Sequence, residues 1–236
     1  MPTGAALAIS ALTKRYGRLV AVRDLDLAVE TGEIFGFLGV NGAGKSTTIR
    51  ILLDFVRPTS GRASIFGHDC QSDGLAARAA VGYLPGELGF YEDMTGDAVL
   101  AVTAQLSGAG AVRDAYRREL AGRLELSAAD LGRRIRHYST GMKRKLGLVQ
   151  AFQSDPPMLV LDEPTEGIQP NIIQQIGEVL RKLVRERGMT IVLVEQYLDF
   201  VRQFGEYFYI MNRGTVVAEG PTDSLREELV NRHLSV

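Results

Sequence analysis

Residues 39–47 (Gly-Val-Asn-Gly-Ala-Gly-Lys-Ser-Thr) fit the pattern G-x-x-x-x-G-K-[ST] at every position. Glycine tolerates positive φ angles, so the backbone N–H groups of such a loop can point into one concavity and surround phosphate oxygens. The side chain of Lys45 can reach the β and γ phosphates of a nucleotide, and the hydroxyl of Ser46 can ligate Mg²⁺. The residues that we expect to line this phosphate loop are Gly39, Asn41, Gly42, Gly44, Lys45, Ser46 and Thr47.

Two adjacent carboxylates follow the apolar run 158–161 (Met-Leu-Val-Leu). Asp162, at the carboxyl end of a strand beside the phosphate loop, would hold Mg²⁺ together with Ser46. Glu163 would polarise the attacking water as a general base, a role worth on the order of 10²–10⁴ in rate. Two acids after a strand can also simply begin a loop, but the phosphate pattern in the same chain favours the catalytic interpretation.

The segments on either side of the phosphate loop predict the elements that position it. Residues 34–38 are apolar and typical of a strand, and residues 46–54 are typical of a helix. This is the strand, loop and helix context that the pattern requires, and the helix N-terminus adds a favourable dipole to an anion site. An ordinary Gly-rich turn is the alternative, and both flanks disfavour it.

Composition limits the classes of function. With 236 residues the chain fits one large α/β domain with room for a small inserted subdomain. Because 27 Lys and Arg residues balance 28 Asp and Glu residues, no charge excess indicates a nucleic-acid surface or an anionic membrane face. The single cysteine, Cys70, excludes a disulfide framework within the chain and is compatible with a reducing cytoplasm. No apolar run reaches the ~20 residues of a membrane span, so we expect no direct membrane insertion.

The order of the predicted elements indicates an α/β fold. Residues 7–12 and 25–29 alternate as antiparallel edge strands do, and residues 206–211 and 215–218 predict a closing hairpin. Short apolar runs typical of buried parallel strands are found at 63–66, 80–84, 158–161 and 190–194. Between about 89 and 138, strand signals give way to periodic helical segments, which predicts a helical insertion.

Residues 139–143 (Ser-Thr-Gly-Met-Lys) follow this helical stretch and open a further helix. On its own the segment is a helix cap with Ser139 at the N-cap. Together with the phosphate loop and the two carboxylates, it resembles the signature sequence of the ATP-binding cassette (ABC) family, usually Ser-Gly-Gly-Gln or Ser-Gly-Gly-Met. The resemblance covers almost the whole chain and implies an ATPase coupled to transmembrane transport, with ATP and Mg²⁺ as its ligands.

The resemblance also implies how the sites are assembled. Two cassettes, as a homodimer or a pair, would face each other head to tail, with ATP between the phosphate loop of one and Ser139 and Gly141 of the other. Tyr16 matches the aromatic residue that stacks on adenine, although an isolated Tyr is more often a packing residue. The implied partners are transmembrane permease subunits, which would hold the chain peripherally at the cytoplasmic, inner face of the cell membrane.

The implied fold is α/β, with a P-loop NTPase core built on a mainly parallel sheet. To this core the resemblance adds an N-terminal antiparallel β subdomain and an inserted α-helical subdomain at about residues 88–140. The whole chain, residues 1–236, would form a single nucleotide-binding domain.

Three positions depart from the family pattern. Gly86 stands where a Gln normally touches Mg²⁺ and senses the membrane partner, which leaves open whether neighbouring Glu87 substitutes for it. Gln169 stands where an Asp usually crosses the dimer, and Gln196 stands at the switch position, where a His normally contacts the γ-phosphate. Gln can form a hydrogen bond to that phosphate but cannot carry a positive charge. We therefore assign Glu163 and Gln196 as the catalytic residues and expect slow hydrolysis.

The direction of transport is predicted from two stretches of the chain. Residues up to about 164 resemble drug-export cassettes of the daunorubicin-resistance type, whereas residues from about 163 onward resemble importer cassettes for urea and branched-chain amino acids. This mosaic suggests a hybrid, natural or constructed, and favours multidrug-type export over import. The remaining alternatives are a folded hybrid with weak or no transport and a soluble cassette that works mechanically. Soluble relatives normally carry two cassettes or a long coiled-coil insertion, which disfavours the last alternative.

Overall fold

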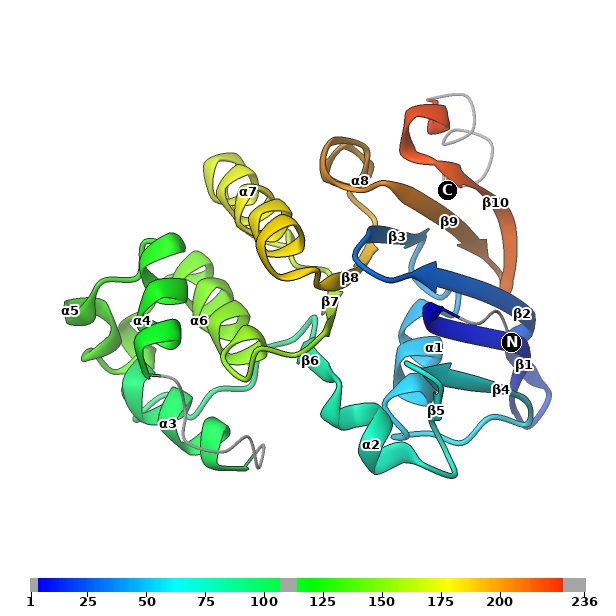
Figure 1. The fold of residues 1–236 in the computed structure, drawn as a ribbon, viewed down its shortest axis with the longest axis horizontal. Helices are drawn as coiled ribbons and strands as arrows, with labels where there is room; N and C mark the ends of the chain where they lie inside the picture. The colour runs from blue at the N-terminus through cyan, green and yellow to red at the C-terminus, as the bar shows by residue number, and fades with distance from the viewer. Residues whose placement is uncertain (1–3, 107–113, 227–236) are drawn as a thin grey trace.

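The computed structural model describes residues 4–106 and 114–226, which form two β-sheets and a group of helices (Figure 1). The strands are β1 (Ala5–Tyr16), β2 (Leu19–Glu30), β3 (Ile34–Gly39), β4 (Ser60–Ile65), β5 (His68–Asp69), β6 (Val81–Leu84), β7 (Met158–Asp162), β8 (Thr190–Glu195), β9 (Tyr207–Asn212) and β10 (Thr215–Pro221). The α-helices are α1 (Lys45–Leu52), α2 (Gly74–Ala79), α3 (Gly96–Leu106), α4 (Asp114–Arg123), α5 (Ala128–Leu131), α6 (Thr140–Phe152), α7 (Pro170–Arg187) and α8 (Leu198–Phe204). Two short 3₁₀ turns, η1 (Ile135–His137) and η2 (Thr222–Ser224), complete these elements.

The larger sheet has six strands in the order β10-β9-β3-β8-β7-β6. Its neighbouring strands run parallel except at β9 and β10, which form the predicted antiparallel hairpin. Parallel strands end at a common edge, so the residues that follow β3, β7, β8 and β9 gather at one end of the sheet. The mainly parallel core predicted from the sequence is confirmed.

The smaller sheet is antiparallel, in the order β2-β1-β4-β5, which confirms the predicted N-terminal β region. The prediction that residues 63–66 form a parallel strand is wrong, because residues 60–65 form β4, which pairs antiparallel with β1. Ala63, Ser64 and Ile65 point to alternate faces of the sheet and all three are buried. Burial on both faces gives an antiparallel strand the continuous apolar pattern that is typical of parallel strands.

Among the described residues, the larger sheet separates the two largest of three apolar clusters, because alternate residues of its strands face opposite sides. In β7, Leu159 and Leu161 pack with the helices that include α3, α6 and α7, while Met158 and Val160 pack with α1 and the antiparallel sheet. Cys70 belongs to the second core, where burial raises the pKa of its thiol to about 12. The fold is thus layered, with helices on one face and α1 with the small sheet on the other.

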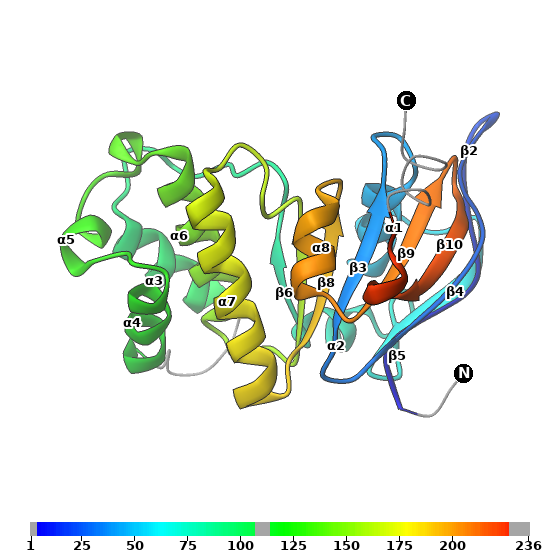
Figure 2. The same cartoon turned by 90° about the horizontal axis from the view of Figure 1, so that it is seen from above.

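The predicted helical insertion is present as α3, α4 and α5, which gather with α6 to one side of both sheets (Figures 1 and 2). Helix α7 lies between this group and the sheet, next to α8 (Figure 2). It begins with Pro170 in its first turn and ends at Arg187, and its C-cap Gly188 adopts the left-handed conformation with φ 64°. Within the described residues, no helix is both long enough and apolar enough to cross a membrane.

Candidate active site

The phosphate loop connects the end of β3 to the start of α1, as the sequence predicts. Gly39 and Gly44 leave no room for larger residues, because a Cβ atom would lie 2.5 Å from Met211 O at Gly39 and 2.5 Å from Ala21 O at Gly44. Gly42 and Gly44 have φ angles of 80° and 111°, a backbone conformation that residues other than glycine rarely adopt. The loop therefore presents bare backbone in a concave turn at the N-terminus of α1.

Lys45 lies inside this loop with only 4% of its surface exposed. Its Nζ atom donates hydrogen bonds of 2.6 Å to Gly39 O and 3.3 Å to Val40 O. Burial lowers the pKa of Lys45, and the nearby charges of Glu163 and Asp162 oppose that shift. The ammonium group is held by two neutral carbonyl acceptors, and anionic phosphate oxygens can form stronger bonds with it because both partners are then charged.

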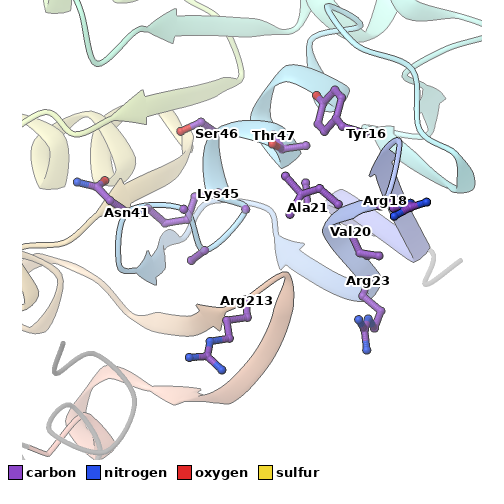
Figure 3. Close-up of a pocket in the computed structure, with 14 residues that line it drawn as sticks. Tyr16, Arg18, Val20, Ala21, Arg23, Asn41, Lys45, Ser46, Thr47 and Arg213 are labelled. Carbon is purple, nitrogen blue, oxygen red and sulfur yellow. The ribbon is translucent and has the colours of Figure 1, made fainter.

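A pocket of about 650 Å³ opens beside the phosphate loop (Figure 3). Tyr16 lies in its wall, 45% exposed, with the Lys14 ammonium 4.9 Å from the ring centroid on one side. The lining residues are Tyr16, Arg18, Leu19, Val20, Ala21, Arg23, Asn41, Gly42, Ala43, Gly44, Lys45, Ser46, Thr47 and Arg213. Thus the structure brings the predicted adenine partner and most of the predicted phosphate-loop residues to one cavity.

Three arginines of this pocket, Arg18, Arg23 and Arg213, were missed by the sequence analysis. Arg213 lies in the β9–β10 turn, and the parallel pairing of β3 with β9 sets Gly39 opposite Met211, so that turn is beside the phosphate loop. The only signal in the sequence is a cation in a hairpin turn, which is common on any surface. The pairing of the strands is what gives it a place near the anion site.

A second pocket, of about 480 Å³, adjoins the first and shares Ser46 with it. Its lining residues are Ser46, Arg50, Tyr83, Pro85, Gly86, Glu87, Asp162, Glu163 and Glu166. Burial and the neighbouring charge of Glu163 raise the pKa of Asp162 to about 6. The predicted metal ligands Ser46 and Asp162 therefore line the same pocket. The positive charges near Asp162 do not fully offset the effects of burial and of Glu163 on its carboxylate.

Glu163 and Gln196 are in direct contact across the ends of β7 and β8. Nε2 of Gln196 donates a 2.6 Å hydrogen bond to Oε1 of Glu163 and a 3.0 Å hydrogen bond to Oδ1 of Asn41. Glu163 has a positive φ of 49°, and its backbone N–H donates to Val194 O. Residues that follow three different strands are therefore joined at the sheet edge where the two pockets lie.

Ser139 and Gly141 line neither of these two pockets. Ser139 is the N-cap of α6 and its Oγ accepts a 3.2 Å hydrogen bond from Met142 N. A Cβ atom at Gly141 would lie 2.7 Å from Cδ1 of Ile172 in α7. Helix α6 belongs to the helical group, whereas α1 lies on the other side of the larger sheet (Figure 1). The structure of one chain does not bring the predicted signature residues to the phosphate loop.

Gly86 lies at the second pocket, where the sequence lacks the expected Gln. A Cβ atom there would be 3.9 Å from a carboxylate oxygen of Asp162 and 3.9 Å from one of Glu163. A longer side chain at this position would therefore point among the acids, and Gly86 provides none. Glu87 lines the same pocket and adds a further carboxylate. Gln169, the other departure, is the exposed N-cap of α7.

A family model described as ABC transporter matches residues 22–166 of the chain. The daunorubicin resistance ATP-binding protein DrrA3 of Streptomyces coeruleorubidus is 37% identical over 94% of this chain and 70% of its own length. The bacitracin transport ATP-binding protein BcrA of Bacillus licheniformis is 34% identical over 92% of this chain and 70% of its own length. A solved ATP-binding subunit of an ABC transporter is 29% identical, with a TM-score of 0.84 over 98% of this chain and 95% of its own.

These alignments bear on the suspected hybrid. The match to daunorubicin resistance proteins covers 94% of the chain in one case and 95% in another, so it crosses residues 163 and 164. The comparisons therefore give no support to a junction at that point. The similarity to this group of ATP-binding proteins extends over nearly the whole chain.

Proposed function

This chain belongs to the ABC transporter family of ATP-hydrolysing cassettes, and from that premise we propose that it drives an export permease. The observation that supports its site assignment is the convergence of Lys45, Ser46 and Asp162 on two adjoining pockets. The two pockets form one continuous surface, which comprises the wall with Tyr16, the glycine-lined phosphate loop and the carboxylate pair. This surface fits the base, the phosphates and the attacking water of ATP in that order.

Ser46 and Asp162 fit a divalent cation, because both offer oxygen atoms to one pocket and Mg²⁺ prefers oxygen ligands. The raised pKa of Asp162 supports this assignment, since a cation would favour the ionised carboxylate. Mg²⁺ bound between them would supply positive charge to the β and γ phosphates. Lys45 would add a second positive charge, because its ammonium group would leave the carbonyl oxygens of the loop and bind phosphate oxygens.

Glu163 is the proposed general base. Its carboxylate faces the second pocket and accepts the Gln196 hydrogen bond, so the carboxylate is already oriented at the end of β7. It would accept a proton from water as the water attacks the γ-phosphate. Gln196 would hold this carboxylate and donate a hydrogen bond to the phosphate, without supplying a charge.

Ser139 and Gly141 enter this proposal through a second copy of the cassette. Because they line neither pocket of their own chain, we place them on the γ-phosphate of the facing copy in a head-to-tail dimer. The N-terminus of α6 then supplies backbone N–H groups and a favourable dipole to that phosphate. The chain would remain one nucleotide-binding domain, held by its permease at the cytoplasmic face of the membrane.

Export is the direction that the relatives support. Relatives whose alignments cover more than 90% of the chain are named for daunorubicin resistance, bacitracin transport and Nod factor export. The surface that we propose for permease docking comprises the loop at Gly86 and Glu87 and the adjoining helices α3 and α4. This surface would determine which permease binds, while Gln169 and Gln196 would affect the rate of ATP hydrolysis.

Pull-down of the purified chain against two kinds of permease tests this proposal. We expect capture by a membrane subunit of the drug-export type, and ATPase stimulation in vesicles that contain it. A permease for urea or branched-chain amino acids is the matched comparison, and its selective capture would overturn the proposed direction. Absence of ATP hydrolysis in the pure chain and in both vesicle types would overturn the role as a transport motor.

A further inference from the structure

Glu195, the last residue of β8, is a carboxylate with only 2% of its surface exposed. Its Oε1 atom accepts hydrogen bonds from Thr165 N at 3.1 Å and from Thr165 Oγ1 at 2.7 Å. Its Oε2 atom accepts from Gln196 N at 3.1 Å and from Tyr197 N at 3.3 Å. One buried side chain therefore ties together the segments that follow β7 and β8.

The three backbone N–H donors and the Thr165 hydroxyl favour an ionised acceptor. Each partner donates, and a carboxylate can accept at both oxygens, whereas a protonated acid or an amide has a donor at one of them. Burial raises the pKa of Glu195, and the hydrogen bonds from Thr165, Tyr197 and Gln196 lower it. The positive charges of Lys45 and Arg144 lie close enough to interact with Glu195.

Both segments that Glu195 joins carry residues of the proposed hydrolysis site. Thr165 lies two positions after Glu163, whose positive φ is unusual for a residue with a long side chain. Gln196, whose backbone N–H is held by Glu195, donates its side-chain hydrogen bond back to Glu163. A closed ring thus runs by hydrogen bonds from Thr165 to Glu195, from Gln196 N to Glu195 and from Gln196 Nε2 to Glu163, and along the backbone from Glu163 to Thr165.

We propose that Glu195 and Thr165 are positioning residues that hold Glu163 and Gln196 in the geometry for ATP hydrolysis. Neither residue lines the two pockets, so both act through their neighbours. A backbone conformation with positive φ persists only where its surroundings fix it, and the two hydrogen bonds that Thr165 donates to Glu195 provide that restraint close to Glu163. The inference rests on the proposed role of Glu163 as general base.

The first experiment compares Thr165→Val with Thr165→Ser. Val keeps the shape of Thr and its backbone N–H donor to Glu195 but loses the hydroxyl donor, whereas Ser keeps both donors. We expect kcat to fall about tenfold or more in Thr165→Val, the size expected for losing a hydrogen bond to a charged group, and to be largely rescued in Thr165→Ser. The KM for ATP and the ATP affinity by calorimetry should stay within about twofold of the original values, because the pockets are not touched.

Unchanged kcat in Thr165→Val would overturn the proposal. So would a loss of ATP affinity as large as the loss of kcat, or a lower Tm with unchanged kcat per folded molecule, since these indicate a general structural role. Glu195→Gln should reproduce the loss of kcat, because its amide N–H₂ would face N–H donors. If that variant does not fold, the Thr165 pair alone decides.

A double-variant cycle tests the route of the effect. Thr165→Val should cost less in a Gln196→Leu background than in the original chain, because the Gln196 hydrogen bond, one of the two ways in which Glu163 is held, is already absent there. Full additivity would contradict a route through Gln196. Glu163→Gln separates this inference from the proposed function: retained hydrolysis there refutes the base assignment, whatever Thr165→Val does. Loss of hydrolysis in Glu163→Gln with full activity in Thr165→Val refutes the positioning role alone.

Discussion

Nε2 of Gln196 donates a hydrogen bond of 2.6 Å to Oε1 of Glu163, although the two residues follow different strands. The same nitrogen also donates to Oδ1 of Asn41 in the phosphate loop, so both amide hydrogens are used. The switch position is therefore in contact with the proposed base and with the loop that would hold the phosphates. An uncharged amide makes both contacts.

Replacing Gln196 tests what this contact contributes. Gln196→Leu removes both hydrogen bonds and should lower kcat about tenfold, since one of them is made to a carboxylate. Gln196→His should be neutral or faster, because an imidazole can donate to Glu163 and can also carry a positive charge. Steady-state ATPase assays on the three proteins give the comparison.

A large loss of turnover in Gln196→His would contradict this expectation. It would show that the position is shaped for an amide that donates to Asn41 and Glu163 together. The slow basal hydrolysis expected from an uncharged switch residue can be measured in the same assay on the original chain.

Lys45→Ala should abolish ATP binding measured by calorimetry. The variant removes the ammonium group that lies within the phosphate loop and that interacts with the nearby carboxylates Asp162 and Glu163. Lys182→Ala is the matched control, because Lys182 is an exposed residue of α7 that pairs with Glu186. Unchanged nucleotide affinity in Lys45→Ala would refute the assignment of the site.

Glu163→Gln should leave ATP binding intact and trap an ATP-bound dimer. The change removes the general base and one negative charge that would face the γ-phosphate. Size-exclusion chromatography with and without ATP measures the dimer, and Glu178→Gln on the exposed face of α7 is the control. A Glu163→Gln variant that stays monomeric in ATP would contradict the head-to-tail arrangement.

The apparent affinity for Mg²⁺ should fall as the pH is lowered through about 6, the value to which burial and Glu163 raise the pKa of Asp162. Below that value a proton competes with the cation, so the affinity should drop about tenfold per pH unit. Titration of ATPase activity with Mg²⁺ between pH 8 and 5.5 measures this. Affinity that does not change over that range would contradict the assignment of Asp162 as a ligand.

The same shift affects the stability of the metal-free protein. The carboxyl of an unfolded Asp has a pKa of about 3.9, so the folded protein binds the extra proton between about pH 4 and 6. Stability should therefore decrease as the pH rises through that range, because the folded state must then ionise a buried group. Asp162→Asn should flatten this part of the denaturation profile.

Local patterns were sufficient to predict much of this structure. The phosphate loop, the strand before Asp162 and the hairpin at 207–221 each depend on neighbouring residues, and the structure has all of these elements. Sheet membership does not depend on neighbours alone. The pattern at 63–66 predicted burial correctly but not the direction of strand pairing. Apolar residues on both faces give the same sequence pattern in parallel and antiparallel strands.

The contacts that complete the site could not be predicted from spacing. Gln196 and Asn41 are separated by 155 positions in the chain and meet only because β3 and β8 are neighbours in the sheet. Glu195 was overlooked because an acid at the end of an apolar strand ordinarily faces solvent. Its burial becomes visible only when the segment after β7 is placed beside it.

The burial of Cys70 has a practical consequence for measuring motion. It is the only cysteine of the chain, and its thiol, fully enclosed and with a pKa raised to about 12, stays protonated and out of reach of maleimide at neutral pH. A cysteine introduced at an exposed position would therefore react alone, with no need to remove the native one first. Spin labels or fluorophores placed in this way on α6 and near the phosphate loop could report distances between two copies as they approach and separate.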